Sequence, residues 1–548
     1  MTTIETHATS AAPASAGLSS VAEWITTTDH KRLGRLYLGA SALSLVGSLV
    51  VAALLAFERV DTATTFLNIG SITQLFSVYR FGLTYMVMLP VVIGVALVVV
   101  PLQLGSRSLA FPRLAAAGFW TWLIGAIASV VAIVANGGPN GGNPRFVDLF
   151  TLAAALALAG LVLTLVSLAT SILTTRTPGM NMKRVPVFSW SVLVMALTSV
   201  LALPIVIGLL VLVYVAHKYP SLSELSGNHA VDTWVSFGFT HPTTILFTIP
   251  VFGFLAEVVA TASKRRLRPR GPVLAASALV GVALLATAIQ TPVIIRAGFR
   301  SLSGGDKISD LAPYAVVHVL PLLGAFLAVA LVLPFVGRAK PSAPLLLGVL
   351  AALLGLAGVA ASALQHIGDA ALIGTTFEEG TWLLLVSSVV VFAMGAVVYW
   401  APKWSGRSLP AVPAMGLGFL TFVGGLLAGV PMLIAGFADQ PGAVFPAVEP
   451  GVEGVIKFSY SGPSGLWNVL TGVGLSLMLV TTLAFVALTL RAAAKGERAG
   501  DDPWDGQTLE WATPSPAPSD NFAALHVITS AEPLLDLKPA TTSERSDA

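Results

Sequence analysis

The sequence contains twelve apolar runs that are each long enough to cross a lipid bilayer. A spanning helix needs about 20 apolar residues, because each residue rises about 1.5 Å through a hydrocarbon core about 30 Å thick. We predict helices because the runs are continuous and rich in leucine and alanine, and because lipid cannot satisfy backbone polar groups. The runs cover residues 35–57, 81–104, 114–136, 147–175, 187–216, 234–262, 272–297, 311–337, 342–364, 380–401, 411–437 and 464–490.

The composition excludes a soluble protein of this size. Of 548 residues, 55% are hydrophobic and 10% are charged, whereas a soluble domain carries about 25% charged residues. The absence of cysteine excludes disulfides, iron–sulfur clusters and thiolate metal sites. The small net charge of +3 indicates positively charged loops, and we expect no nucleic-acid partner.

The distribution of lysine and arginine predicts that both termini are cytoplasmic. With that orientation, and counting up to residue 498, the inner segments hold 20 of these residues and the outer segments hold 8, as the positive-inside rule requires. Residues 1–24 are polar and lack a basic start followed by a short apolar core, so we predict a disordered cytoplasmic lead and no signal peptide. Residues 25–495 form the predicted transmembrane domain. Residues 496–548 are polar and rich in proline and serine, which predicts an extended or partly disordered cytoplasmic tail.

Short motifs at the helix ends, in the loops and in the tail occur in a fixed order along the chain. They are residues 28–32 (TDHKR), 74–76 (QLF), 101–103 (PLQ), 110–114 (AFPRL), 177–182 (TPGMNM), 239–242 (FTHP), 502–504 (DPW) and 508–511 (TLEW). Each motif is weak alone, but the ordered set with its spacing resembles subunit I of the bacterial haem-copper oxidases, the cytochrome c oxidase subunit I family. The resemblance implies an all-α fold of twelve transmembrane helices in the bacterial cytoplasmic (inner) membrane.

The same resemblance implies haem positions that this sequence fills with other residues. The family holds a low-spin haem and a haem–copper pair with six histidines, because imidazole is a suitable ligand for iron and copper. Spacing from the motifs places Tyr79 where helix two carries a haem-ligating histidine. Gly380 and Trp382 stand at the two histidine positions of helix ten. We therefore expect no haem bound in the family manner.

The copper and haem-propionate positions are also altered. His241 on helix six is a relict of the family copper site, and Ile289 and Gln290 fall at the other two copper positions. The arginine pair that anchors the haem propionates is replaced by Met432 and Leu433. One imidazole does not make a three-imidazole copper site, so we expect no resident copper either.

Other polar residues in the spans have structural interpretations. Arg80 and Glu257 lie near span ends, where a charged side chain can reach water. His318 lies about one turn inside helix eight, where we expect a hydrogen-bonded interior histidine and no metal ligand.

Three functions compete at this point. The family proton path is interrupted, because Ser108, Leu97 and Ala115 stand at its polar positions. The first reading is therefore a degenerate, non-catalytic subunit I-like protein that assembles in the membrane lipid with subunit II- or III-like partners or assembly factors. The second is a terminal oxidase subunit that transfers electrons from cytochrome c to oxygen with proton pumping, and it would need haem and copper. The third is a transporter, channel or sensor that uses the vacated haem cavities.

Overall fold

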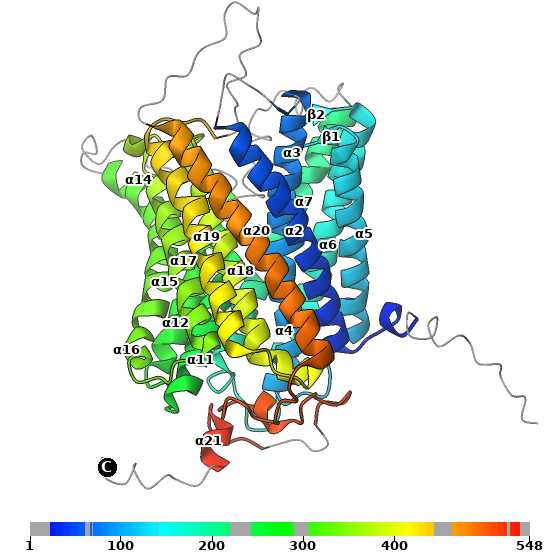
Figure 1. The fold of residues 1–548 in the computed structure, drawn as a ribbon, viewed down its shortest axis with the longest axis vertical. Coiled ribbons are helices and arrows are strands. Elements are labelled where there is room, and N and C mark those ends of the chain that lie inside the picture. Colours follow the sequence, from blue (N-terminus) through cyan, green and yellow to red (C-terminus); the bar gives the residue numbers. More distant parts are fainter. Residues whose placement is uncertain are drawn as a thin grey trace, which may run out of the picture.

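The computed structural model describes residues 22–60, 66–67, 69–139, 141–219, 243–289, 306–442, 463–522 and 527–537. Within these residues, twelve helices are long and apolar enough to cross a membrane, which confirms the predicted fold class (Figure 1). The spans are His30–Glu58, Gln74–Gln103, Pro112–Val134, Pro144–Thr174, Val187–Lys218, Thr243–Ser263, Arg270–Thr287, Leu311–Val336, Ala343–Gln365, Thr376–Ser405, Ala411–Phe437 and Ser464–Lys495.

Several spans are single helices and others are composed of shorter pieces. The single helices are α2 (His30–Glu58), α5 (Pro112–Val134), α6 (Pro144–Thr174), α7 (Val187–Lys218), α17 (Ala343–Gln365), α18 (Thr376–Ser405), α19 (Ala411–Phe437) and α20 (Ser464–Lys495). The composite spans contain α3 (Ile69–Phe81), the π-helical η1 (Gly82–Met88), α4 (Leu89–Gln103), α10 (Thr243–Leu246), α11 (Ile249–Ser263), α12 (Arg270–Val280), η2 (Gly281–Ala283), α13 (Leu284–Ile289), α14 (Asp306–Tyr314), η3 (Ala315–Val319), α15 (Leu320–Ala330) and α16 (Leu333–Val336). The remaining elements are β1 (Gly137–Gly138), β2 (Gly141–Gly142), η4 (Gly368–Ala370), η5 (Leu509–Ala512) and α21 (Pro533–Leu537).

The helix starts follow local sequence signals. The side chain of Asp29 accepts a hydrogen bond from the Lys31 amide and caps α2, and Asn143 caps α6 in the same way. Such side chains satisfy amide donors that the first helical turn leaves without partners. Pro112 and Pro344 occupy the first turns of α5 and α17, where proline costs no hydrogen bond.

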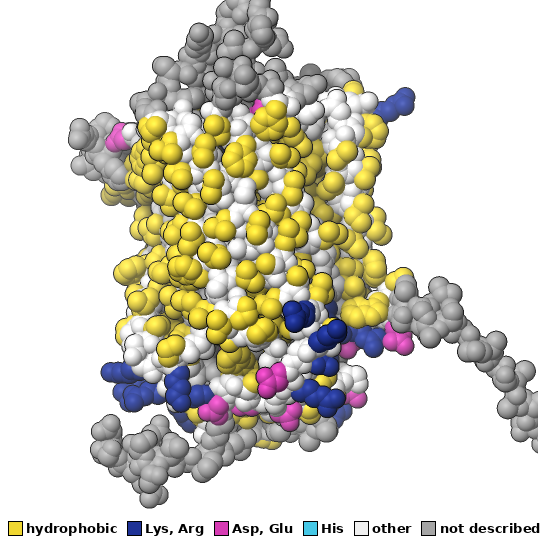
Figure 2. Space-filling view, viewed as in Figure 1, with side chains coloured by type: hydrophobic (Ala, Val, Ile, Leu, Met, Phe, Trp, Pro, Cys, Tyr) yellow, Lys and Arg dark blue, Asp and Glu magenta, His cyan; other side chains and the backbone are white. Residues whose placement is uncertain are grey.

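Three spans form the interior of the bundle, and the others surround them. The spans Gln74–Gln103, Thr243–Ser263 and Thr376–Ser405 are almost completely buried by their neighbours. The surrounding helices expose large apolar side chains, which form a continuous band on the face shown in Figure 2. Lysine and arginine gather at the end of the bundle that carries α21, which we call the tail end; the opposite end is the loop end. The membrane orientation stays a prediction.

The C-terminal tail lies against the tail end of the bundle. Most of its described residues have no regular secondary structure, in agreement with the predicted extended segment. Leu509, Glu510 and Trp511 are nevertheless buried. Asn521 also binds the family-like motif at the start of α2, because its amide lies 2.9 Å from Nε2 of His30. The tail is therefore packed where it is described. Of the predicted N-terminal lead, residues 1–21 lie outside the described residues, and residues 22–25 form a helical turn.

Candidate functional site

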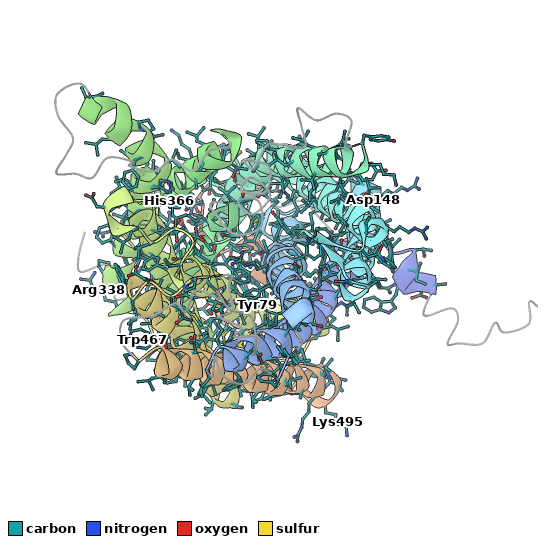
Figure 3. The ribbon with its side chains drawn as sticks, turned by 90° about the horizontal axis from the view of Figure 1, so that it is seen from above. Tyr79, Asp148, Arg338, His366, Trp467 and Lys495 are labelled. Atoms are coloured by element: carbon teal, nitrogen blue, oxygen red, sulfur yellow. The ribbon has the colours of Figure 1, made fainter. Side chains whose placement is uncertain are left out.

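Tyr79 and Trp382 meet in the interior of the bundle. Tyr79 lies on α3 and Trp382 on α18, and both side chains are buried. Their ring centroids are 5.1 Å apart with an interplanar angle of 84°, which is an edge-to-face contact. Seen along the helices, Tyr79 lies inside the ring that they form (Figure 3). Two of the residues at the haem-ligand positions implied by the resemblance therefore touch each other directly.

A buried ion pair lies beside this aromatic contact. Arg59, which follows α2, places Nη2 2.8 Å from Oε2 of Glu379 on the first turn of α18. The two side chains are only 4% and 7% exposed. The Tyr79 hydroxyl donates to Oε1 of Glu379 at 3.4 Å, and Arg59 Nη2 donates to the carbonyl of Gly442 at 2.5 Å. The carboxylate thus joins α2, α3 and α18 at the loop end.

Further contacts fix the arginine. Its guanidinium carbon lies 5.0 Å from the ring centroid of Phe76, within cation–π range. Arg59 Nη1 also lies 3.7 Å from the sulfur of Met432, one of the two residues at the propionate-anchor positions. We call Arg59, Phe76, Tyr79, Glu379, Trp382 and Met432 the Arg59 cluster. The ion pair between Arg59 and Glu379 is almost completely buried. Removal of one partner would therefore leave the other as a buried charge without its counter-ion.

Gly380, the other predicted haem position on α18, faces the backbone of α19. A Cβ atom built on Gly380 would lie 2.7 Å from the carbonyl oxygen of Gly429 and 2.8 Å from the amide nitrogen of Leu433. Distances below 3.0 Å do not occur for real Cβ atoms, so the two helices touch through glycine. Leu433, at the second propionate-anchor position, therefore packs directly against α18 beside Gly380.

The predicted copper positions lie at the edge of the described structure. His241 and Gln290 fall outside the described residues, and Ile289 is the last residue of α13, with no side-chain description. Next to them, Thr243 on α10 and Thr287 on α13 share a hydrogen bond of 3.0 Å between their hydroxyl groups. The proposal that His241 is a relict of a copper site therefore rests on the sequence alone.

His318 and His366 form a buried stack that the sequence did not indicate. The centroids of the two imidazole rings are 4.0 Å apart, and the rings are inclined by 21°. Burial lowers the pKa of His366 to about 4, so this ring is neutral near neutral pH. Within the described part of the chain, no group of three or more His, Cys, Asp or Glu residues is placed to hold a metal ion. The stack is consistent with the predicted interior role of His318.

A second polar cluster lies under the tail. Glu510 of η5 accepts hydrogen bonds from Nε2 of Gln103 at 3.0 Å and from Nε1 of Trp400 at 3.3 Å. Glu257 of α11 accepts a hydrogen bond of 2.9 Å from the hydroxyl of Thr508. The expectation that Glu257 reaches water at the interface is wrong, because the tail covers it and leaves it 5% exposed.

The protonation of Glu510 is expected to control how firmly the tail is held. Burial raises the pKa of this carboxyl group above its usual range, despite the hydrogen bonds that it accepts. Because the pKa is raised in the folded state, the neutral carboxyl group stabilises the bound tail. This stabilisation is complete at pH values below the unfolded-state pKa of about 4.3. The stabilisation is lost as the pH rises through the folded-state pKa. We expect hydrogen exchange of residues 508–513 to become faster as the pH increases, beyond the intrinsic change in exchange rate.

Two variants separate this effect from general changes with pH. The Glu510→Gln variant keeps the shape of the side chain but cannot ionise, so its tail protection should change less with pH than that of the wild type. Glu497 is exposed, and Glu497→Gln should behave as the wild type. The same pH dependence in wild type and Glu510→Gln would contradict this role of Glu510.

Sequence reasoning missed the Arg59–Glu379 pair. Arg59 counts as an ordinary outer-loop cation, and Glu379 lies just before the apolar run 380–401. The sequence contained one signal for this pair. Arg59 and Glu379 each lie directly beside a span, and both lie at the same predicted end of the bundle. Arg80 lies inside the span that begins at Gln74 and not at its end, with its guanidinium carbon 5.9 Å from the ring centroid of Phe76 and its Nε buried.

Known proteins resemble the chain over nearly its whole length. The family model for cytochrome c and quinol oxidase polypeptide I matches residues 32–475. The putative cytochrome c oxidase subunit 1-beta of Streptomyces avermitilis is 27% identical over 96% of this chain and 93% of the relative. Cytochrome c oxidase subunit 1 of Bacillus subtilis is 24% identical over 93% of this chain and 82% of the relative.

A solved structure supports the same fold. It is described as a heme-copper terminal oxidase dimer and matches with a TM-score of 0.62 at 12% identity, over 86% of this chain and 85% of that chain. Together with the twelve apolar spans, the bacterial relatives make the protein a multi-pass protein of the bacterial inner membrane. Because the family model covers most of the sequence, the chain belongs to the cytochrome c and quinol oxidase polypeptide I family.

Proposed function

We propose that this chain is a family member that does not itself reduce oxygen, and that it acts as a structural or assembly partner of respiratory complexes. The proposal separates two properties that the family combines. One is the twelve-helix scaffold with its packed tail, which this chain has. The other is the set of side chains that hold haem and copper, which we propose it lacks.

The contact between Tyr79 and Trp382 carries the proposal. A low-spin haem held in the family manner lies as a flat ring between ligands from helices two and ten. Here the residues at those positions are in edge-to-face contact, with ring centroids 5.1 Å apart, which leaves no room for a planar macrocycle between them. Seating one would require the two inner helices to move apart and would disturb the adjacent ion pair of Arg59 and Glu379.

The chemistry of the side chains supports the same proposal. The indole nitrogen of Trp382 is a donor only, with no lone pair to give to iron. It also lacks a hydrogen-bond partner among the described residues. The hydroxyl of Tyr79 already donates to Glu379 at 3.4 Å, and Gly380 has no side chain. The residues present do not fit a haem.

The packed tail favours a partner role over a transporter or sensor role. Glu510, Asn521 and Trp504 hold the tail on the bundle through hydrogen bonds to Gln103, His30 and the carbonyl of Tyr399. The docked tail therefore forms a surface of fixed shape at the tail end, and a second subunit can recognise that surface. The relatives are named as oxidase subunits, that is, as components of larger assemblies.

A reduced-minus-oxidised visible spectrum of the purified protein tests the proposal, together with pyridine haemochrome and copper analysis. We expect neither haem nor copper in stoichiometric amount. A complete cytochrome c oxidase subunit I, purified in parallel from the same host, controls for cofactor supply. Stoichiometric haem in this protein would refute the proposal, and His318 and His366 would then be the first residues to replace.

Affinity purification from the native membrane tests the partner role. We expect a subunit II- or III-like polypeptide or an assembly factor to co-purify at a fixed ratio. Tail truncation after residue 506 should abolish that co-purification while the twelve helices stay folded. Stabilisation by a small solute, with no protein partner, would instead support the transporter, channel or sensor alternative.

A further inference from the structure

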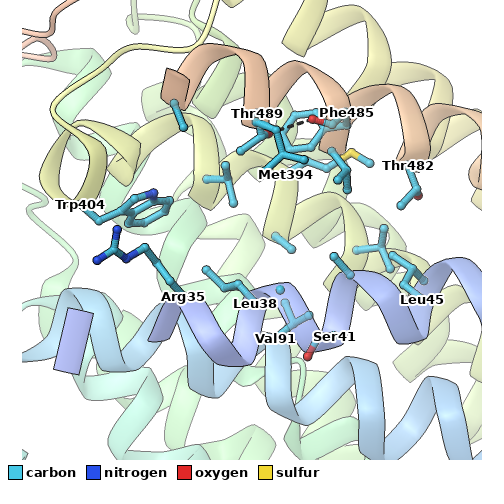
Figure 4. A pocket seen from close by; sticks show the side chains of 18 of the residues that line it. Arg35, Leu38, Ser41, Leu45, Val91, Met394, Trp404, Thr482, Phe485 and Thr489 are labelled. Atoms are coloured by element: carbon cyan, nitrogen blue, oxygen red, sulfur yellow. Dashed lines mark hydrogen bonds between the residues drawn. The ribbon is translucent and has the colours of Figure 1, made fainter. Parts of the chain in front are cut away.

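A groove opens between α2 and α20 in the half of the bundle next to the tail end. Its volume is about 320 Å³, and α18 forms its floor (Figure 4). Most of the wall residues are apolar, among them Leu38, Ala42 and Leu45 of α2, Met394 of α18 and Phe485 of α20. Four hydroxyl side chains also line the groove: Ser41, Ser405, Thr482 and Thr489.

The length of the groove matches one leaflet of a bilayer. Its residues on α2 run from Arg35 to Leu45, which is ten steps of about 1.5 Å, or about 15 Å. The hydrocarbon core is about 30 Å thick, so this distance is about half of it. The exposed positions Gly39, Leu490 and Ala493 lie on its rim, so the groove faces the apolar surface of the bundle. An acyl chain lying along the groove would therefore extend from the membrane interface to the bilayer centre.

Arg35 is the one charged residue among those that line the groove, and it lies at the end nearest the tail. Its side chain points to the same end as the ring of Trp404 (Figure 4). Within the described residues no acidic side chain forms an ion pair with it, and its Nε is buried without a hydrogen-bond partner. Arg32, one turn earlier, is instead paired with Glu23 at 3.3 Å.

The indole ring of Trp24 lies beside Arg35 at this end of the groove. Its guanidinium carbon lies 4.8 Å from the ring centroid of Trp24, within cation–π range. Tryptophan is enriched at membrane interfaces, and arginine binds phosphate with a planar fork of donors. No carboxylate lies within ion-pair distance of Arg35 among the described residues, although Asp29 acts on it from farther away. A cation so placed at the headgroup end of an acyl-length groove is complementary to one class of molecule.

We propose that this groove is a specific binding site for an anionic phospholipid, with one acyl chain along α2 and α20 and the phosphate at Arg35. The groove supplies the apolar contact that any lipid would use, and Arg35 supplies the charge that selects an anionic headgroup. The site is independent of the haem question, because it lies on the outer surface of the bundle and shares no residue with the Arg59 cluster.

Native mass spectrometry of the full chain from mixed micelles with equal amounts of phosphatidylglycerol and phosphatidylcholine tests this site. We expect the wild type to retain one phosphatidylglycerol in clear preference. The preference should fall to parity in Arg35→Gln and should persist in Arg35→Lys. The matched control is Arg113→Gln, because Arg113 is an exposed arginine at the same end of the bundle, on α5 and away from the groove.

A second variant tests the groove itself. The substitution Ala42→Phe fills the groove and leaves the charge in place, so retained lipid should be lost without a change in the elution volume of the protein. Equal retention of both lipids by the wild type, no retained lipid, or an unchanged preference in Arg35→Gln would each overturn the proposal. An Ala42→Phe variant that keeps its bound phosphatidylglycerol would place the lipid elsewhere and overturn it as well.

Discussion

Glu379→Ala is expected to lower the free energy of unfolding by about 3–5 kcal/mol, because it leaves Arg59 charged and buried without its carboxylate. The pair is 2.8 Å apart and at most 7% exposed, so solvent screens it little. The hydroxyl of Tyr79 loses its acceptor in the same variant. Thermal unfolding in detergent, followed by circular dichroism, measures the effect.

The double variant Arg59→Leu/Glu379→Leu provides the control for this loss. Replacing both partners of a buried ion pair with apolar groups is often nearly neutral, whereas removing one is costly. The double variant should therefore be more stable than either single variant, and the interaction energy follows from the double-mutant cycle. A single variant with wild-type stability would show that the charge on Arg59 reaches water.

Gly380→Ala is also expected to destabilise the protein, through a single added methyl group. The new Cβ atom would lie 2.7 Å from the carbonyl oxygen of Gly429, and that oxygen belongs to a helix backbone that cannot rotate away. Overpacking of this kind costs about 1–3 kcal/mol and sometimes more. Gly380→His, which installs the residue implied by the family resemblance, should separate α18 from α19 and should not create a haem site.

Gly416→Ala serves as the matched substitution on α19. A Cβ atom built on Gly416 meets nothing within 4 Å. The variant should keep the wild-type stability or gain up to about 1 kcal/mol from higher helix propensity. Equal stability of the Gly380 and Gly416 alanine variants in the same thermal assay would contradict a close contact between α18 and α19.

The sequence predicted the fold well because a single physical requirement determines it. Every span must bury its backbone polar groups and present apolar side chains, so hydropathy alone locates all twelve. Boundaries differ where short segments have their own signals. The span predicted from residue 35 begins at His30, because Asp29 caps the helix. The span predicted to begin at residue 81 begins at Gln74, where polar residues continue the helix at the loop end.

The candidate site was predicted only in part. The motif spacing placed Tyr79 and Trp382 at corresponding positions of the second and tenth spans, and both side chains are buried. The spacing did not reveal that the two rings touch, or that Glu379 is bound to Arg59. These contacts join residues about 300 positions apart in the chain, and their geometry depends on how the helices pack. A single charged residue beside a span is interpreted as an interface anchor when the position of its ion-pair partner is not known.

The position of the tail has a consequence for biogenesis. Glu510 is bound by side chains from the second and tenth spans, and Thr508 binds the sixth. All three spans must already be inserted and packed before these contacts can form, and residues 508–511 are synthesised after all twelve spans. Docking of residues 508–511 is therefore a late step that follows assembly of the helical bundle. Protection of this segment would mark a correctly completed molecule during membrane insertion.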